Sequence, residues 1–236
     1  MTFFYLMYDW TYILVIIGAL LCVGASALVN GTFARYSGVQ TSRGITGAGA
    51  AKTLLNTNGI YIPITRISGS LTDHYDPSQK TLSLSDPVFG QTSISAVAVA
   101  AHECGHALQD DQSYLPLRFR TALVPVVNFG ATISWPLIFI GFLLNGNISV
   151  WLLDAGTILF SLVLLFQLVT LPVEFNASSR ALHMLDNEGI LTKEEMAGAR
   201  KVLVAAAMTY VASVASSALQ LLRLLILIGG KNSSND

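Results

Sequence analysis

The chain has 236 residues, of which 53% are hydrophobic and only 11% are charged, and its formal net charge is −1. Soluble domains usually carry about 25% charged residues, so this composition excludes an ordinary soluble domain and indicates a protein that spans a membrane. The near-neutral charge, without a long basic run, gives no reason to expect a nucleic-acid partner.

Four segments are apolar for long enough to cross a bilayer, which takes about 20 residues of helix. They are residues 10–29, 122–144, 148–171 and 202–228. No positive charge precedes the first segment, so it is predicted to be a retained anchor and not a cleaved signal peptide. The second and third segments are separated only by a short uncharged turn and are predicted to form a hairpin.

The basic residues predict the orientation of the chain. Of the thirteen Lys and Arg residues, seven lie in 30–121 and four in 172–201. The positive-inside rule therefore predicts that both segments face the cytoplasm. The whole chain, 1–236, is then expected to be a single multi-pass domain in a lipid bilayer.

The long segment between the first two predicted spans contains sequence signals for short helices and strands. A helix is predicted near residue 50, ending at Asn58-Gly59, and "IYIPITRISG" is predicted to be a strand. The stretch "TLSLS" (81–85) alternates as a strand should, and Thr92 or Ser93 can cap the helix that follows. The fold class predicted is mainly α, with about four transmembrane helices and a small α+β cytoplasmic part.

The predicted helix after Ser93 carries the motif "HECGH". His102 and His106 are four positions apart and share one helical face, so both can bind one zinc ion. Glu103 is next to the first ligand but off the metal, where it can act as a general base. The motif therefore predicts one catalytic Zn²⁺, which lowers the pKa of its water to about 7.

A catalytic zinc needs a third protein ligand. The candidates are Glu174, Asp154, His74 and His183. Glu174 follows the third span, and the residues three, four and seven positions after it are all small. They would let a helix starting near Pro172 pack closely on the histidine helix. His183 would lie on the opposite side of that helix, so Glu174 is the predicted ligand.

The motifs "AAHECGHALQ", "FQLVTLPVEFNAS" and "LTKEEMAGARKVL" resemble, in order and spacing, the YugP-type family of neutral zinc metallopeptidases of bacterial membranes. This family is related to the gluzincins of the HtpX and CAAX-endopeptidase types, which implies that the α+β part is zincin-like and that the protein lies in a bacterial cell membrane. The resemblance covers nearly the whole chain. It implies that His102, His106 and Glu174 bind zinc, that Glu103 is the catalytic base, and that the substrate is a polypeptide in or near the membrane.

Further roles follow from the same resemblance. The HtpX-type pattern has an Asp four positions after the glutamate, where this chain has Ser178, which could hold a zinc histidine by a weaker hydrogen bond. Gluzincins add the substrate to an edge strand, for which 81–85 is the candidate, although it could equally be an ordinary structural strand. His74 and Tyr75 are candidate donors to the oxyanion.

Two alternatives remain open. A site-2-type intramembrane protease would use Asp154, in "LLDAG", as its third ligand. A non-catalytic membrane scaffold would keep zinc for folding and would need four protein ligands and no base. The short apolar run before the motif and the presence of Glu103 favour a metalloendopeptidase at the cytoplasmic face.

Overall fold

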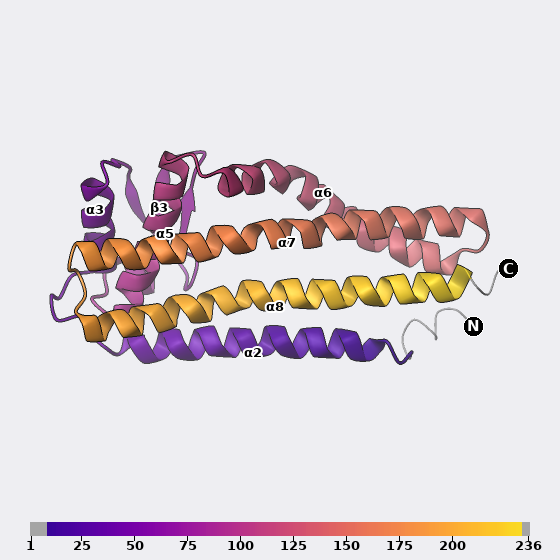
Figure 1. The fold of residues 1–236 in the computed structure, drawn as a ribbon, viewed down its shortest axis with the longest axis horizontal. Helices are drawn as coiled ribbons and strands as arrows, with labels where there is room; N and C mark the ends of the chain where they lie inside the picture. The colour runs from indigo at the N-terminus through magenta and orange to yellow at the C-terminus, as the bar shows by residue number, and fades with distance from the viewer. Residues whose placement is uncertain (1–8, 233–236) are drawn as a thin grey trace. The chain divides into compact units, whose positions relative to one another are not determined.

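The structure, a computed structural model, describes residues 9–232 (Figure 1). The chain divides into two compact units, and each is described by itself. The mixed unit comprises residues 25–118 and 171–209. The helical unit comprises the described parts of the remaining segments, which are 9–24, 119–170 and 210–232.

Four long helices supply the whole helical unit and part of the mixed one. They are α2 (Tyr12–Ser37), α6 (Leu115–Leu143), α7 (Asn147–Asn187) and α8 (Lys193–Asn232). Each is long and apolar enough to cross a membrane, and no other helix within residues 9–232 meets both conditions. The predicted mainly α fold, with four membrane helices and a small sheet, is confirmed.

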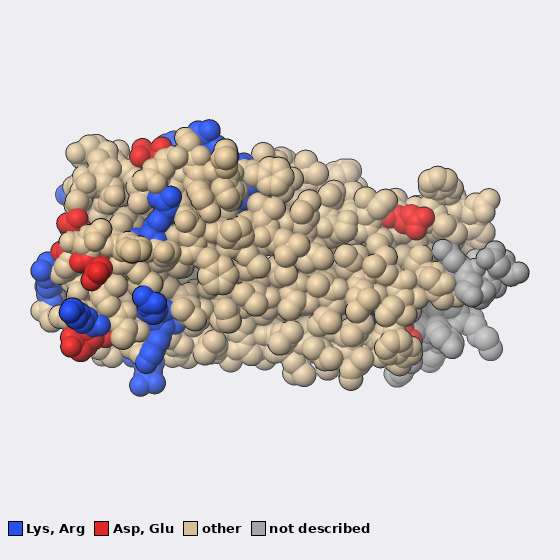
Figure 2. All heavy atoms as spheres, viewed as in Figure 1, with Lys and Arg blue, Asp and Glu red and all other residues tan. Residues whose placement is uncertain are grey.

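The surfaces of these helices suit a lipid environment. In α2, Ile16, Leu20 and Val23 expose 45%, 65% and 66% of their surface, which would be costly in water. On the face drawn in Figure 2, Lys and Arg side chains lie over the mixed unit and the start of α6, whereas the long stretches of α7 and α8 show none. Apolar helix surfaces of this kind are expected to contact acyl chains.

The mixed unit also contains the short elements between α2 and α6. They are α3 (Gly47–Thr57), β1 (Ile64–Ile67), β2 (His74–Asp76), β3 (Thr81–Ser85), α4 (Asp86–Phe89) and α5 (Ile94–Asp111). The α3 helix ends at Asn58 as predicted, and Gly59 follows with φ +74°. Asn58 and Gly59 therefore form the predicted helix stop.

The three strands form one sheet in the order β1-β3-β2. The β3 strand pairs with β1 in parallel and with β2 in antiparallel register. The strand predicted at 81–85 is therefore present, but its prediction as an edge strand was wrong. A central strand must bury both faces, and Leu82 and Leu84 are fully buried while Ser83 and Ser85 are also buried. The edge strand on the α5 side is β2, which is in contact with that helix.

The α5 helix begins at the predicted cap and is nearly enclosed. The Ser93 hydroxyl accepts a hydrogen bond from the amide of Ala96, as an N-cap does. Val97, Ala100 and Ala101 are fully buried, and Cys104 on the same helix packs toward the backbone of Ala51 in α3. The histidine helix is thus a core helix of the mixed unit.

The helix that carries Glu174 does not start near Pro172, contrary to the prediction. Pro172 lies inside α7, which runs without a break from Asn147 to Asn187. A proline removes one backbone hydrogen bond, yet transmembrane helices tolerate it where neighbouring groups compensate. The predicted third span, 148–171, and the helix that carries Glu174 are therefore one helix, α7.

Close packing of α5 on α7 depends on Gly105. A Cβ at this position would lie 2.4 Å from the carbonyl oxygen of Ala177, which belongs to rigid helix backbone. Gly105→Ala is therefore expected to force the helices apart and to lower the free energy of unfolding by about 1–3 kcal/mol. Thermal unfolding in detergent measures the change.

Gly31→Ala in α2 is the matched control, because nothing lies within 4 Å of its added Cβ. This control is expected to be neutral or slightly stabilising. Equal melting temperatures for Gly105→Ala and the wild type would contradict the packing described.

Candidate metal centre

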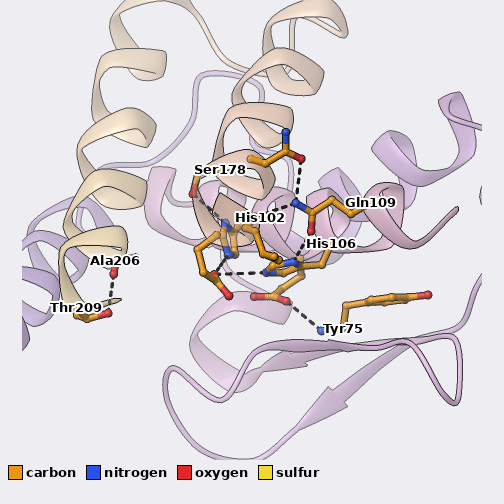
Figure 3. Close-up of polar contacts among 11 residues, drawn as sticks. Tyr75, His102, His106, Gln109, Ser178, Ala206 and Thr209 are labelled. Atoms are coloured by element: carbon orange, nitrogen blue, oxygen red, sulfur yellow. Dashed lines mark hydrogen bonds and ion pairs between the residues drawn. The ribbon is translucent and has the colours of Figure 1, made fainter. Parts of the chain in front are cut away.

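Two helices of the mixed unit bring three potential metal ligands together. His102 and His106 extend from α5, and Glu174 extends from α7. One Glu174 oxygen, Oε2, lies 3.2 Å from His102 Nε2 and 3.6 Å from His106 Nε2. The ligand atoms of this His-His-Glu group all lie within 4.8 Å of one another. Figure 3 shows the two histidine rings side by side, with their dashed contacts converging.

The group fits a zinc ion by its chemistry and its spacing. Zinc in catalytic sites takes three protein ligands, and two imidazoles with one carboxylate are a known set. Two ligands bonded to a tetrahedral zinc at about 2.0–2.1 Å lie roughly 3.4 Å apart. Both nitrogen–oxygen separations to Glu174 are close to this value.

The second nitrogen of each histidine is also engaged. His102 Nδ1 lies 3.1 Å from the Ser178 hydroxyl oxygen, the contact predicted for Ser178. His106 Nδ1 lies 3.0 Å from Gln109 Oε1. Metal-binding histidines commonly donate their other N–H to an oxygen, which orients the ring and fixes its tautomer. In both rings Nε2 is then left for a metal.

Glu103 is held by the main chain of the edge strand. It is on α5 and 8% exposed, and its Oε2 accepts a hydrogen bond of 3.0 Å from the backbone N–H of Tyr75. Among the described residues, the His-His-Glu group has no fourth His, Cys, Asp or Glu, so Glu103 is not part of it. The Glu103 carboxylate therefore lies on the same helix as the two histidines but outside the group of potential ligands.

The metal centre is buried, so its charged groups shift the pKa values of their neighbours. Burial lowers the pKa of His106, but hydrogen bonds to Glu174 and Gln109 and the negative charges of Glu103 and Glu174 together raise it above its ordinary value. Burial raises the pKa of the Cys104 thiol, so this cysteine stays protonated and is no thiolate ligand.

The structure leaves other candidate residues outside the His-His-Glu group. His74 is exposed, and its Nδ1 contacts the carbonyl oxygen of Thr72 at 2.9 Å. His183 is exposed on α7, and Asp154 is exposed in the helical unit. None of these three residues joins the ligand group found among the described residues.

Tyr75 contributes to the centre in a way that its sequence position did not indicate. Its hydroxyl donates a hydrogen bond of 2.7 Å to Asp110, which also pairs with Lys80. Burial and the hydrogen bond to Asp110 raise the pKa of Tyr75, so the phenol remains neutral. Its backbone N–H, and not its side chain, contacts Glu103. The oxyanion role of His74 and Tyr75 stays a prediction.

Sequence reasoning missed Gln109 and Asn176. Gln109 is completely buried, and Asn176 accepts a hydrogen bond from it across α5 and α7. Asn176 is two positions after Glu174, a spacing that does not bring two side chains together on a helix. Gln109 had a signal in its spacing, because it is three positions after His106. A helix places residues three positions apart on neighbouring parts of its surface.

These features define a membrane protein with a His-His-Glu metal group of the kind that zinc peptidases use. The model of the family described as "Putative neutral zinc metallopeptidase" matches residues 11–229. The chain belongs to this family. It is also 47% identical over 208 residues to the "Putative membrane protease YugP" of Bacillus subtilis (strain 168), a match that covers 87% of this chain and 91% of that protein. No solved structure matches the chain.

Proposed function

We propose that the protein is a zinc-dependent endopeptidase embedded in the cell membrane, which hydrolyses peptide bonds at the cytoplasmic face. One observation carries this proposal: two imidazole nitrogens and one carboxylate oxygen converge from α5 and α7, with the Glu103 carboxylate on the same helix as the two histidines. Membership in a zinc metallopeptidase family supports the same chemistry.

His102, His106 and Glu174 would hold the ion. A zinc ion in this place would polarise the scissile carbonyl and make water more acidic. Glu103 accepts the proton of the attacking water while the water oxygen bonds to the carbonyl carbon. As the carbon–nitrogen bond breaks, Glu103 passes that proton to the leaving amine. The backbone N–H of Tyr75 keeps the Glu103 carboxylate in place for both transfers.

The β2 strand is the surface on which we place the substrate. Tyr75 pairs with Leu82 of β3, yet its N–H is directed at Glu103. In an antiparallel pair, N–H and C=O of one residue point to the same side, so both backbone groups of Tyr75 face away from β3. An extended peptide added along this edge would lie beside Glu103 and pair with the C=O of Tyr75, because the N–H of Tyr75 is already bonded to Glu103.

The cytoplasmic orientation is supported by the Lys and Arg distribution and can be tested by labelling. In a Cys22→Ala background, Gln79→Cys is expected to resist a membrane-impermeant thiol reagent added to intact cells and to react after the cells are opened. Gln79 is exposed and Cys104 is fully buried, so the new thiol supplies the signal.

Asn145→Cys is the matched control for orientation. It lies exposed in the turn between α6 and α7 and should react in intact cells. Labelling of position 79 from outside, with position 145 protected, would reverse the proposed topology.

The activity itself is tested with purified full-length protein in detergent and an unfolded, fluorescently quenched casein as substrate. Cleavage is expected to stop with 1,10-phenanthroline, to continue with the non-chelating 1,7-isomer and to return when zinc is added. Cleavage that is unaffected by the chelator would contradict a zinc-dependent mechanism.

A further inference from the structure

Gln109 is a buried polar residue, and both the nitrogen and the oxygen of its side chain have hydrogen-bond partners. Its side chain is completely buried in α5, and an amide in such a place is costly unless it is hydrogen-bonded. Its Nε2 donates to the backbone oxygen of Val173 at 2.8 Å and to Asn176 Oδ1 at 2.9 Å. Its Oε1 lies 3.0 Å from His106 Nδ1. Figure 3 shows Gln109 between His106 and the neighbouring helix.

These contacts fix which way the amide faces. The Val173 carbonyl can only accept a hydrogen bond, so it must face the NH₂ group of Gln109. Asn176 Oδ1 also accepts from Arg180 Nε at 2.7 Å, which fixes this second acceptor as an oxygen. Gln109 Oε1 is therefore presented to His106, and His106 Nδ1–H donates to it. This selects the tautomer with a free Nε2.

The same side chain connects both helices of the metal centre. Gln109 is three positions after His106 on α5, and Val173 immediately precedes Glu174 on α7. One amide thus contacts a histidine ligand directly and the main chain beside the carboxylate ligand. Loss of this amide would remove the hydrogen bond that orients the His106 ring. It would also remove the hydrogen bond that holds the backbone beside Glu174 close to α5.

We propose that Gln109 is a positioning residue for the metal centre, which sets the tautomer of His106 and holds the backbone beside Glu174 at the distance that metal binding requires. This inference rests on the proposed function, because it takes His106 and Glu174 as ligands. Gln109 itself does not touch the metal or the substrate in this role.

The test measures zinc affinity by competition with a chromogenic chelator, and kcat and KM separately. Gln109→Met, which keeps the length but loses the polar atoms, is expected to weaken zinc binding by about 10–100-fold, the usual effect of losing an outer partner of a ligand. In the zinc-loaded protein kcat should fall while KM changes little. The Co²⁺-loaded protein should show a changed visible absorption spectrum, because the ligand geometry is altered.

Ser95→Ala is the matched control. Ser95 is also fully buried on α5, and its hydroxyl donates a hydrogen bond of 2.8 Å to Phe33 of α2. Its loss is expected to lower the melting temperature and to leave zinc affinity unchanged. Gln109→Glu keeps an acceptor for His106 but loses both donor contacts to α7, so its zinc affinity is expected to lie between those of Gln109→Met and the wild type.

Wild-type zinc affinity and kcat in Gln109→Met would overturn the positioning role. If that variant does not fold, Gln109→Asn and Gln109→Glu replace it. The shorter Asn cannot reach His106 and should bind zinc more weakly than Glu, and the reverse order would overturn the role. A wild-type protein that binds no zinc would overturn the proposed function as well, whereas unaffected variants of a zinc-binding wild type would overturn this inference alone.

Discussion

Replacing Glu103 with Gln is expected to slow peptide hydrolysis by about 10²–10⁴-fold, the usual contribution of a general base. Gln has the same shape but cannot accept a proton from water. It still offers an oxygen to the backbone N–H of Tyr75, so the strand and the helix should stay in place. The measurement is the cleavage rate of the quenched casein, beside zinc content and melting temperature.

Glu194→Gln is the control for this change. Glu194 is exposed at the start of α8, and its replacement should leave the rate unchanged. A Glu103→Gln protein with wild-type turnover would contradict the role of general base. Loss of zinc from that protein would instead make Glu103 a ligand.

Removal of Glu174 is expected to abolish zinc binding and activity together. Glu174 Oε2 contacts both histidines and is 2% exposed, so Glu174→Ala removes one of three ligands from an enclosed site. Even the loss of an outer hydrogen-bond partner weakens metal binding by about 10–100-fold, so losing a ligand should exceed this range. Zinc per protein chain, measured on the purified protein after dialysis, is the readout.

Asp154→Asn is the comparison that separates the two protease hypotheses. Asp154 lies twenty residues before Glu174 on the same helix, which at 1.5 Å per residue is about 30 Å. Asp154→Asn should therefore keep wild-type zinc content. Loss of zinc from Asp154→Asn, with zinc retained by Glu174→Ala, would contradict Glu174 as a ligand. That result would favour the site-2-type protease with Asp154 as the third ligand.

Much of the fold was predictable because its signals are local. The four apolar segments became four long helices, and Ser93 caps α5 where the motif helix was expected to begin. The placement of His102 and His106 on one face of α5 followed from their spacing, since i and i+4 share a face. Such patterns depend on neighbouring residues alone.

Two of the differences concern contacts between distant segments, and one concerns a proline within a helix. Alternation in "TLSLS" identified a strand but not its neighbours, and both partners of β3 come from earlier in the chain. Pro172 suggested a helix start, yet α7 continues through it, as transmembrane helices can. The role of Gln109 depends on a carbonyl 64 residues away, which no local pattern contains.

Zinc K-edge X-ray absorption of the purified wild-type protein shows whether the His-His-Glu group holds one zinc ion. We expect one zinc per chain, with two imidazole nitrogens at about 2.0–2.1 Å and oxygen ligands at about 2.0–2.2 Å. A sulfur ligand at about 2.3 Å, or no bound zinc after zinc is supplied, would contradict it.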